Sequence, residues 1–513
     1  MKLNEQAHDE LVKNLATRLS KTSGLRTRIY RTHISSVIVC GHYAYKLKRP
    51  VRLPFVDFSS AALRREDCKR ELRMNQRTAP GLYLGIVKIT GKTEHPVLKG
   101  SGPTIDWAVK MRRFKQSALL SRLIARSELS EKHARCLGQH LAEYSTRLPG
   151  LAPEVTAKHR TTMTWLLQSL DEILNVFPKQ GPLAQKIRAW AKSEETALHG
   201  LFERRRKSGF YRDCHADLHL GNLVKLGKQI IAFDALEFNE ELSQIDVVND
   251  IAFAFMDFLA YGRPDLAWSM INQWLENSAD YEGLNLLRYY TLYRAVVRAK
   301  VAALTTCGHA TSESFERYWN LAGSLISPAN PPRLILVAGL SGSGKSTVAR
   351  QLSAALSGVQ LRSDVVRKHL FADLQSNPKA LYARAATQKT YSQLSQLASR
   401  LLEQNMTVIV DATFLSQPEV DTFTRLAFTH QIALQVVWCE APLNVLEKRI
   451  RKRLASGKDP SDATVAVLHR QISRSAQHPV CWPVKPMRLD TNAKRSRVTT
   501  RIWGLARELL MTK

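Results

Sequence analysis

The sequence is short of acidic residues and cysteines, and it contains no long apolar run. Only 45 Asp and Glu stand against 75 Lys and Arg in 513 residues, which gives a formal net charge of +30. The seven cysteines form no CxxC pair and are odd in number, which argues against a disulfide framework and favours a reducing, cytoplasmic compartment. The N-terminus has no apolar signal segment, and Asp250 and Asp257 interrupt the most apolar stretch, so we expect no signal peptide and no membrane span.

The excess of basic residues indicates either an anionic partner or a basic surface without a specialised role. A surface of this charge attracts nucleotides, phosphorylated metabolites, nucleic acid or an acidic membrane face. Aromatic residues make up only 8% of the chain, and no stretch forms an obvious platform for stacking bases. Nucleic acid therefore remains an alternative beside a small-molecule substrate.

The chain is too long for one hydrophobic core, and its composition changes near residue 330. Three prolines in SPANPP, residues 327–332, predict an extended linker. Residues 333–513 alternate short apolar strands with helices, which predicts an α/β domain with a parallel sheet covered on both faces. Residues 1–326 have strands first and helices after, with one hairpin in LVKLGKQIIAFD, which predicts a two-lobed α+β domain.

The clearest motif is GLSGSGKST, Gly339 to Thr347, which follows an apolar strand and opens a helix. Its glycines let backbone N–H groups turn toward phosphate oxygens, and the helix N-terminus adds partial positive charge. Lys345 would reach the terminal phosphates, and the Ser346 hydroxyl would ligate Mg²⁺. The motif predicts ATP and Mg²⁺ binding by Gly339, Gly342, Ser343, Gly344, Lys345, Ser346 and Thr347.

Two carboxylates follow strands of the same domain. Asp411 ends TVIVD, where it could hold Mg²⁺, and Asp364 ends QLRSD, where it could face the phosphate loop or cap the next helix. The basic stretch LNVLEKRIRKRLASGKDPSD is either a solvated helix face or a mobile lid. In the lid hypothesis Arg449 and Arg453 stabilise charge on the transferred phosphoryl group.

A second set of candidates lies in HADLHLGN, which has the spacing H-x-D-x-x-x-x-N. In a kinase-type site Asp217 would accept the proton of the acceptor hydroxyl and Asn222 would ligate Mg²⁺. Asp234 follows the predicted hairpin and supplies a second metal ligand. A zinc site made from His215, Asp217 and His219 is the alternative, because alternate residues of a strand share one face.

A kinase-type site also needs a cation on the nucleotide phosphates. AYKLKRP places Lys46 and Lys48 on the same side of a strand, and Glu71 in the basic helix downstream could pair with one of them. We favour Lys46 as the nucleotide contact, while surface ion pairs would explain either lysine equally well.

These motifs resemble known families. From Arg333 on, the chain resembles the small P-loop kinases, including gluconate kinase-like, polynucleotide kinase-like and zeta toxin-like proteins. That resemblance implies that Asp364 accepts the proton of the acceptor hydroxyl and that Arg367 orients the substrate.

The N-terminal part resembles the aminoglycoside phosphotransferase-like branch of the kinase fold. The whole chain is similar to bacterial proteins that join such a domain to a P-loop domain, through AYKLKRP, HADLHLGN, FDALEFN, GLSGSGKST and SDVVRKHL. The resemblance implies that Asp217 is the base and that Asn222 and Asp234 are metal ligands. Ala216 replaces the glycine usual in antibiotic kinases, and CGHYAY has one glycine instead of a Gly-rich loop, so antibiotic substrates are in doubt.

The sequence thus predicts a phosphotransferase that moves the terminal phosphate of Mg-ATP to a hydroxyl of a small molecule. A nucleic-acid kinase acting on a 5′-hydroxyl or on RNA is the first alternative, supported by the charge and by ERRRKSG. A nucleotide-binding regulatory module without turnover is the second.

Overall fold

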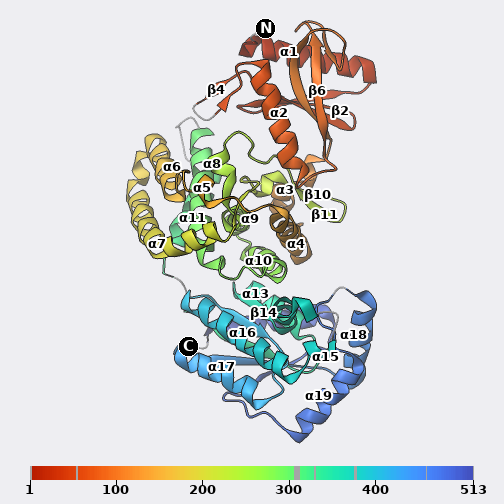
Figure 1. Cartoon of the computed structure of the whole chain (residues 1–513), viewed down its shortest axis with the longest axis vertical. Helices are drawn as coiled ribbons and strands as arrows, with labels where there is room; N and C mark the ends of the chain where they lie inside the picture. Colours follow the sequence, from red (N-terminus) through yellow and green to blue (C-terminus); the bar gives the residue numbers. More distant parts are fainter. Residues whose placement is uncertain are drawn as a thin grey trace. The chain divides into compact units, whose positions relative to one another are not determined.

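The computed structural model describes residues 3–53, 56–305, 312–328, 331–374, 378–457 and 459–511. They pack into two compact units (Figure 1). The first unit is Met1–Tyr261 with Leu286–Leu325, and the second unit is Gly262–Asn285 with Ile326–Lys513. No described helix is long and apolar enough to cross a membrane.

The first unit begins with a six-stranded antiparallel sheet covered by one helix on each face. The strand order is β1 (Thr27–Arg31), β2 (Ser35–Cys40), β3 (Tyr43–Lys48), β8 (Thr104–Arg112), β6 (Tyr83–Gly91) and β7 (Pro96–Leu98). Tyr45 and Leu47 of β3 join the core under α1 (Glu5–Ser23). Because side chains of a strand alternate between faces, Lys46 and Lys48 lie on the other face, which α2 (Ala61–Gln76) covers.

The rest of the first unit is mainly helical. Its principal helices are α3 (Leu120–Ala125), α4 (Glu131–Arg147), α5 (Pro153–Thr156), α6 (Thr162–Val176), α7 (Gly181–Lys207), α8 (Glu240–Ser243), α9 (Val247–Ala260), α11 (Leu284–Thr305) and α12 (Glu313–Leu325). The predicted hairpin is confirmed: β10 (Leu223–Leu226) pairs antiparallel with β11 (Gln229–Ala232). A second short pair joins β9 (Tyr211–Asp213) to β12 (Gln244–Asp246). Every α9 residue from Val247 to Phe258 is buried, which explains its apolar sequence without a membrane.

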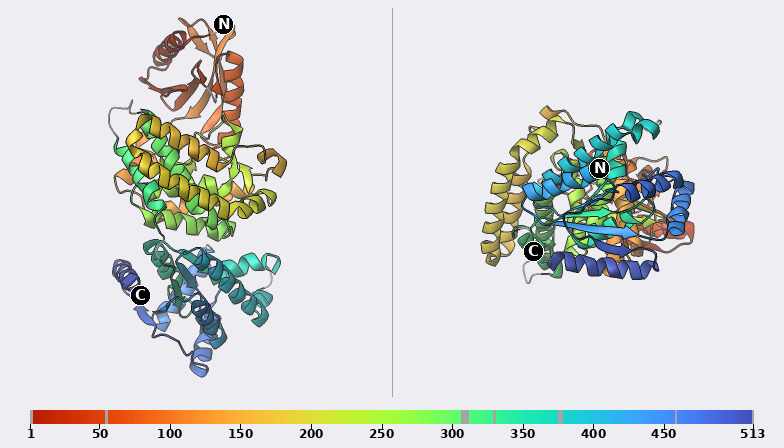
Figure 2. Two further views of the ribbon diagram at one scale, coloured as in Figure 1. Left: turned by 90° about the vertical axis from the view of Figure 1, so that its left-hand side faces the viewer. Right: turned by 90° about the horizontal axis from the view of Figure 1, so that it is seen from below.

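The second unit contains the predicted parallel sheet. Its order is β14 (Val359–Arg362), β15 (Val408–Asp411), β13 (Leu334–Ala338), β16 (Leu434–Glu440) and β17 (Met487–Asp490). Helices lie on both sides of it (Figure 2), and α13 (Lys345–Ala355) and α20 (Arg495–Met511) share one apolar core with the central strands. The remaining helices are α14 (Ser363–Leu370), α15 (Pro378–Leu381), α16 (Arg384–Glu403), α17 (Gln417–Thr429), α18 (Leu443–Ser456) and α19 (Val465–Gln477).

One helix departs from the predicted division at residues 327–332. Helix α10 (Pro264–Ser278) lies in the predicted first domain, but it packs into the second unit. There Asn272 donates to the Gly358 carbonyl at 2.9 Å and accepts from the Gln360 N–H at 2.7 Å, which satisfies backbone groups at the free edge of β14. The composition of a linker indicates where the chain is extended, but it does not indicate which unit a neighbouring helix packs into. Residues 329 and 330 of the predicted linker lie outside the described residues.

Candidate functional site

The lysine pair of β3 lies in a cluster of carboxylates. Lys46 Nζ donates to Glu71 Oε1 at 2.9 Å and also pairs with Asp234. Lys48 Nζ contacts Glu71 Oε2 at 2.7 Å and Asp67 Oδ2 at 2.8 Å, and pairs with Glu237. These are the four carboxylates of the cluster.

The exposure of the two lysines separates their roles. The Lys48 side chain is fully buried, whereas that of Lys46 is 11% exposed and touches the 44% exposed Asp234. Lys46 is therefore the lysine placed to meet a ligand beside Asp234, and Lys48 is a structural centre of the ion cluster.

The electrostatics keep Lys46 charged. Burial by itself lowers the pKa of Lys46, but Asp234 and Glu71 raise that pKa well above its ordinary value. Burial raises the pKa of Glu71, but the two lysines lower it to about 2. Four carboxylates against two lysines leave a formal excess of negative charge, which suits an added divalent cation beside Asp234.

The predicted catalytic loop brings Asp217 and Asn222 together. Asn222 Nδ2 donates to Asp217 Oδ2 at 2.7 Å and to the Asp217 carbonyl at 3.1 Å, which leaves the Asn222 side-chain oxygen as the atom able to ligate a cation. The Asp217 side chain is 36% exposed, and His219 Nε2 lies 3.5 Å from its Oδ2. Enclosure by the protein raises the pKa of Asp217, but His219 and Arg298 lower it to about 2, so the group is an ionised acceptor at neutral pH.

The zinc alternative does not fit this loop. Residues 215–219 are not a strand, so the expected shared face does not exist. His215 Nε2 contacts the Phe233 carbonyl at 3.0 Å and His215 Nδ1 accepts from the Asp217 N–H at 3.3 Å, so both ring nitrogens are occupied. Among the described residues, no group of three or more His, Cys, Asp or Glu is arranged to hold a metal ion.

Asp234 is held in a left-handed backbone conformation, with φ 61°. Its N–H donates to Tyr83 Oη at 3.1 Å, and the N–H of the next residue, Ala235, donates to Asn75 Oδ1 at 2.9 Å. Such a conformation costs about 1 kcal/mol or more for a residue with a side chain. The surrounding hydrogen bonds stabilise it and aim the carboxylate at Lys46.

Two buried aspartates of α9 hold the predicted catalytic loop, and sequence reasoning, which took them only as interruptions of an apolar stretch, missed this role. Asp250 accepts from the N–H groups of His215 at 3.1 Å and Ala216 at 2.8 Å. Asp257, two turns later, accepts from the Leu220 N–H at 2.7 Å and from a tyrosine hydroxyl at 2.8 Å. Two acids seven residues apart in an otherwise apolar helix are the signal that could have revealed them, because a buried carboxylate requires partners.

Ala216 also has a left-handed backbone, with φ 64°, a conformation that glycine adopts with less strain than alanine. Arg294 Nη1 donates to the Ala216 carbonyl at 3.2 Å, and the N–H of Ala216 donates to Asp250. Burial raises the pKa of Asp250 to about 6, even though Arg294 and the two N–H groups favour its ionised form.

The phosphate loop of the second unit depends on its glycines. Gly339, Gly342 and Gly344 have φ of 136°, 82° and 88°. A Cβ on Gly339 would lie 2.4 Å from the Cys439 carbonyl oxygen, and one on Gly342 would lie 2.7 Å from the Leu446 carbonyl oxygen. Only glycine fits these positions, and this is why the loop can present backbone N–H groups.

Lys345, Ser346 and Asp411 meet at the end of this loop. Lys345 Nζ donates to the Leu340 carbonyl at 2.8 Å, so the loop itself satisfies the ammonium group. Burial raises the pKa of Asp411, while Arg362, Lys345 and the Ser346 hydroxyl lower it. The hydroxyl and the carboxylate could hold Mg²⁺ together, as the sequence predicts.

Three further residues support Asp411 without any signal in the sequence. Gln360 Nε2 donates to Asp411 Oδ2 at 3.3 Å, and Arg362 Nε lies 3.6 Å from the same oxygen. Arg362 Nη1 in turn donates to Glu276 Oε1 of α10 at 3.0 Å. Glu276 of helix α10 therefore contacts Arg362, which in turn lies beside Asp411, the predicted Mg²⁺ ligand.

The arginines predicted for catalysis have structural partners. Arg367 is buried, donates to the Leu381 carbonyl at 3.2 Å and lies 4.8 Å from the Tyr382 ring centre. Arg449 donates to Thr491 Oγ1 at 2.9 Å and to the Gly342 carbonyl at 3.3 Å, so it braces the phosphate loop.

Arg453 and Asp364 have different surroundings. Arg453 donates to the carbonyl of Ala463 at 2.8 Å, one residue beyond the stretch predicted as a lid, of which residue 458 lies outside the described residues. Asp364 lies in the first turn of α14, but the N-cap is Arg362, so the capping alternative for Asp364 is wrong. The charge of Asp364 acts on Lys345 and Asp411, which places it near the phosphate loop.

Comparisons with known proteins agree with this description. Residues 334–478 match a protein-family model described as an AAA domain. Uncharacterized proteins of Mycobacterium tuberculosis and Mycobacterium bovis are 28% identical over 485 residues, which cover 91% of this chain and 93% of theirs.

Two solved structures illustrate the likeness of each part. An ethanolamine kinase of Plasmodium vivax is 12% identical, with a TM-score of 0.36, over 60% of this chain and 83% of its own. An APS kinase of Mycobacterium tuberculosis is 22% identical, with a TM-score of 0.27, over 36% of this chain and 100% of its own. The residues that match the AAA-domain model contain the phosphate loop Gly339–Thr347 and four of the five strands of the parallel sheet.

Proposed function

We propose that the first unit transfers the terminal phosphate of Mg-ATP to a hydroxyl group of a small molecule. The observation that carries the proposal is the convergence of Lys46, Glu71 and Asp234, together with the bonded pair Asp217 and Asn222. These residues supply a phosphate-binding cation, metal ligands and a base, which are the groups that phosphoryl transfer needs.

Each side chain has a separate task in this proposal. Lys46, oriented by Glu71, neutralises phosphate charge, while Asp234 and the Asn222 oxygen hold Mg²⁺. Asp217, ionised because of its low pKa, orients the acceptor hydroxyl and receives its proton. The bound Mg-ATP supplies the reactive phosphoryl group and the charge that stabilises the leaving diphosphate.

In the second unit we propose ATP binding by Gly339–Thr347, with Mg²⁺ held by Ser346 and Asp411. Asp364 is the proposed base of this unit, because it follows β14 and its charge acts on Lys345. Arg449 and Arg367 are proposed to act through the loops that they brace, and Arg453 to approach the phosphates from α18.

The test separates the two sites by substitution. Asp217→Asn should lower transfer to a hydroxyl acceptor by about 100-fold to 10,000-fold, because the general base is lost, while ATP binding persists. The assay uses γ-labelled ATP with a panel of small-molecule alcohols, and calorimetry counts the nucleotides bound. Asp171→Asn, at a side chain that is 64% exposed, is the matched control.

Nucleotide stoichiometry tests both units together. We expect two nucleotides bound by the native chain and one by either Lys46→Met or Lys345→Ala. Unchanged transfer in Asp217→Asn, or two nucleotides bound by Lys46→Met, would contradict the assignment of the first site. Binding without transfer to any acceptor would favour the regulatory alternative.

A further inference from the structure

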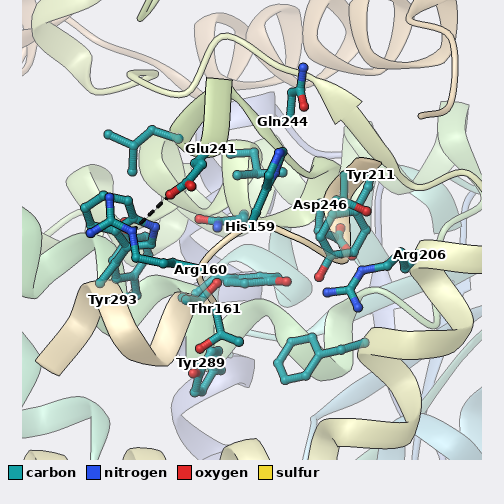
Figure 3. Close-up of a pocket in the computed structure, with 18 of the residues that line it drawn as sticks. His159, Arg160, Thr161, Arg206, Tyr211, Glu241, Gln244, Asp246, Tyr289 and Tyr293 are labelled. Atoms are coloured by element: carbon teal, nitrogen blue, oxygen red, sulfur yellow. Dashed lines mark hydrogen bonds and ion pairs between the residues drawn. The ribbon is translucent and has the colours of Figure 1, made fainter. Parts of the chain in front are cut away.

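His219 lies in the predicted catalytic loop and apart from the pocket of the first unit that Figure 3 shows. That pocket has a volume of about 160 Å³ and is lined by residues of α6, α7 and α11, among others, and by Arg160, which pairs with Glu241 at 3.0 Å. Neither Asp217 nor His219 belongs to its walls. The contacts that fix His219 come instead from its own loop and from α9.

The His219 ring is held on two sides by its neighbours. Its Nδ1 accepts the Gly221 N–H at 3.0 Å, and the ring centre of Phe253, in buried α9, lies 5.7 Å from its own. A Cβ on Gly221 would lie 2.6 Å from His219 Cε1, so a larger residue at this position would displace the ring. The His219 side chain is only 15% exposed. The loop and α9 together therefore fix the orientation of the ring.

This orientation decides which ring nitrogen faces Asp217. A neutral imidazole has one acceptor nitrogen and one donor nitrogen, and the acceptor here is Nδ1 because it receives the Gly221 N–H. The ring proton is therefore on Nε2, which lies 3.5 Å from Asp217 Oδ2. Catalytic hydrogen bonds are often this long before a substrate binds and shorten afterwards. His219 thus directs a donor at the proposed base.

The two carboxylate oxygens of Asp217 have different surroundings. Oδ2 accepts from Asn222 Nδ2 at 2.7 Å and faces His219 Nε2. In the part of the chain that the structure describes, no group donates a hydrogen bond to Oδ1, and the Asp217 side chain is 36% exposed. Oδ1 is therefore the oxygen that is open to an acceptor hydroxyl.

We propose that His219 is a positioning residue for Asp217. Together with Asn222 it holds Oδ2 and leaves Oδ1 to receive the proton of the acceptor hydroxyl, a role that rests on the proposed function of the first unit. In that transfer the acceptor oxygen forms the new bond to phosphorus, and the bond to the leaving diphosphate breaks with its electron pair. The hydroxyl proton moves to Oδ1, while His219 keeps its own proton and prevents rotation of the carboxylate.

A purely structural role as a helix cap is the alternative for His219. Its side chain caps the short turn Leu220–Asn222 by accepting the Gly221 N–H. An asparagine side chain also accepts an N–H at a capping position, but it is too short to place a donor beside Asp217. A glutamine side chain is longer and carries its amide N–H close to the place of Nε2. These two substitutions therefore separate capping from positioning.

The test measures hydrolysis of Mg-ATP, with water as the acceptor, by the full chain carrying Lys345→Ala to remove turnover by the second unit. His219→Asn should lower kcat about 10-fold to 100-fold, because a hydrogen bond to a charged group is lost. The KM for ATP should stay within about twofold, since the contact acts on the base and not on nucleotide binding. His219→Gln should restore most of the lost turnover.

The matched control is His133→Asn in α4. His133 also accepts a backbone N–H at Nδ1, from Ser130 at 3.2 Å, so the same chemical change is made at a histidine with a capping role alone. This variant should keep native turnover. Thermal unfolding checks that each variant is folded.

A second measurement tests the geometry without turnover. Nitrogen NMR of the chain with isotope-labelled histidine, assigned with His219→Gln, should show His219 as the Nε2–H tautomer. Because it needs no acceptor, this measurement decides the orientation even when water is a poor acceptor. An Nδ1–H tautomer would overturn the proposal.

Asp217→Asn distinguishes failure of this proposal from failure of the proposed function. If Asp217→Asn keeps native hydrolysis, the base assignment of the first unit is wrong. If Asp217→Asn is impaired but His219→Asn keeps native turnover, only the positioning role of His219 is wrong. Equal impairment of His219→Asn and His219→Gln would also count against positioning, because glutamine restores the donor.

Discussion

The two phosphate-type sites of this chain are built in opposite ways. In the second unit the phosphate loop is nine consecutive residues, Gly339–Thr347, whose glycines set the backbone and whose N–H groups would face the ligand. In the first unit Lys46 pairs with Asp234, 188 positions away in the sequence, and the groups that would bind the ligand are side chains. The site of the second unit depends on local backbone geometry, whereas the site of the first unit depends on contacts between side chains distant in sequence. Substitutions should therefore impair the two sites in different ways.

The supports of the two sites differ as well. The predicted catalytic loop of the first unit is held by hydrogen bonds from its backbone N–H groups to Asp250 and Asp257 of one buried helix. The phosphate loop is braced by Arg449 and Thr491, while α10 supports Asp411 through Arg362. A change to the support of one site should leave the other site unaffected.

The largest effect is expected from Gly339→Ala. Its Cβ would lie 2.4 Å from the Cys439 carbonyl oxygen, and φ of 136° is unfavourable for alanine, so the phosphate loop must shift. Nucleotide affinity of the second unit should fall at least about 100-fold, roughly 2.7 kcal/mol, while the first site keeps its affinity. Calorimetry on the Lys46→Met background isolates the P-loop site.

The matched control is Gly504→Ala in α20, where no atom lies within 4 Å of the added Cβ. Alanine in a helix interior should leave binding unchanged and stabilise the fold by about 0.5 to 1 kcal/mol. Native affinity in Gly339→Ala would show that the loop tolerates a side chain and would break the comparison.

Asp250→Asn should lower phosphate transfer by the first site about 10-fold to 100-fold and should also change its pH dependence. Below pH 6 the native Asp250 is protonated, since its pKa is about 6, and it holds the His215 and Ala216 N–H groups less strongly. Transfer by the native protein should therefore decline as pH falls through 6, and in Asp250→Asn this decline should be absent.

The stability of the fold should change with pH in the opposite direction to the transfer rate. The carboxyl group has a higher pKa in the folded chain than the value of about 4 in an unfolded chain, so the folded state binds more protons between pH 4 and 6. Its contribution to unfolding free energy falls as pH rises through that window, by at most about 3 kcal/mol, and is level above it. Denaturant titrations at pH 4.5 and 7 check the sign, with Asp171→Asn as control.

The smallest effect is expected from Asn272→Ala in α10. The Gly358 carbonyl and the Gln360 N–H at the edge of β14 lose their partners, which should lower the unfolding free energy of the second unit by about 1 to 2 kcal/mol. Gln273→Ala, at a partly buried neighbour with a 3.3 Å contact to Glu276, should cost less. Thermal unfolding compares the two; equal stability would mean that α10 is not an integral part of this unit.

The sequence predicted the fold class of both parts, the five strands of the parallel sheet and the hairpin before Asp234. These features can be predicted because each is set by residues close together in the sequence: short apolar runs bounded by glycine, and strands alternating with helices. The sequence favoured Lys46 over Lys48 but held no physical ground for excluding Lys48, because both lie on one face of β3 and the difference in burial arises only from tertiary packing. The zinc alternative rested on a strand at residues 215–219, where the chain is instead a loop organised by His215.

What the sequence alone determined is the phosphate loop, because spacing within a few residues fixes its local geometry. What only the tertiary structure decided is which distant groups meet: Asp250 under the predicted catalytic loop, and α10 against β14. The physical reason is that a backbone turn is set by its own residues, whereas a buried polar group is defined by the partners that the rest of the chain brings to it or leaves for a ligand.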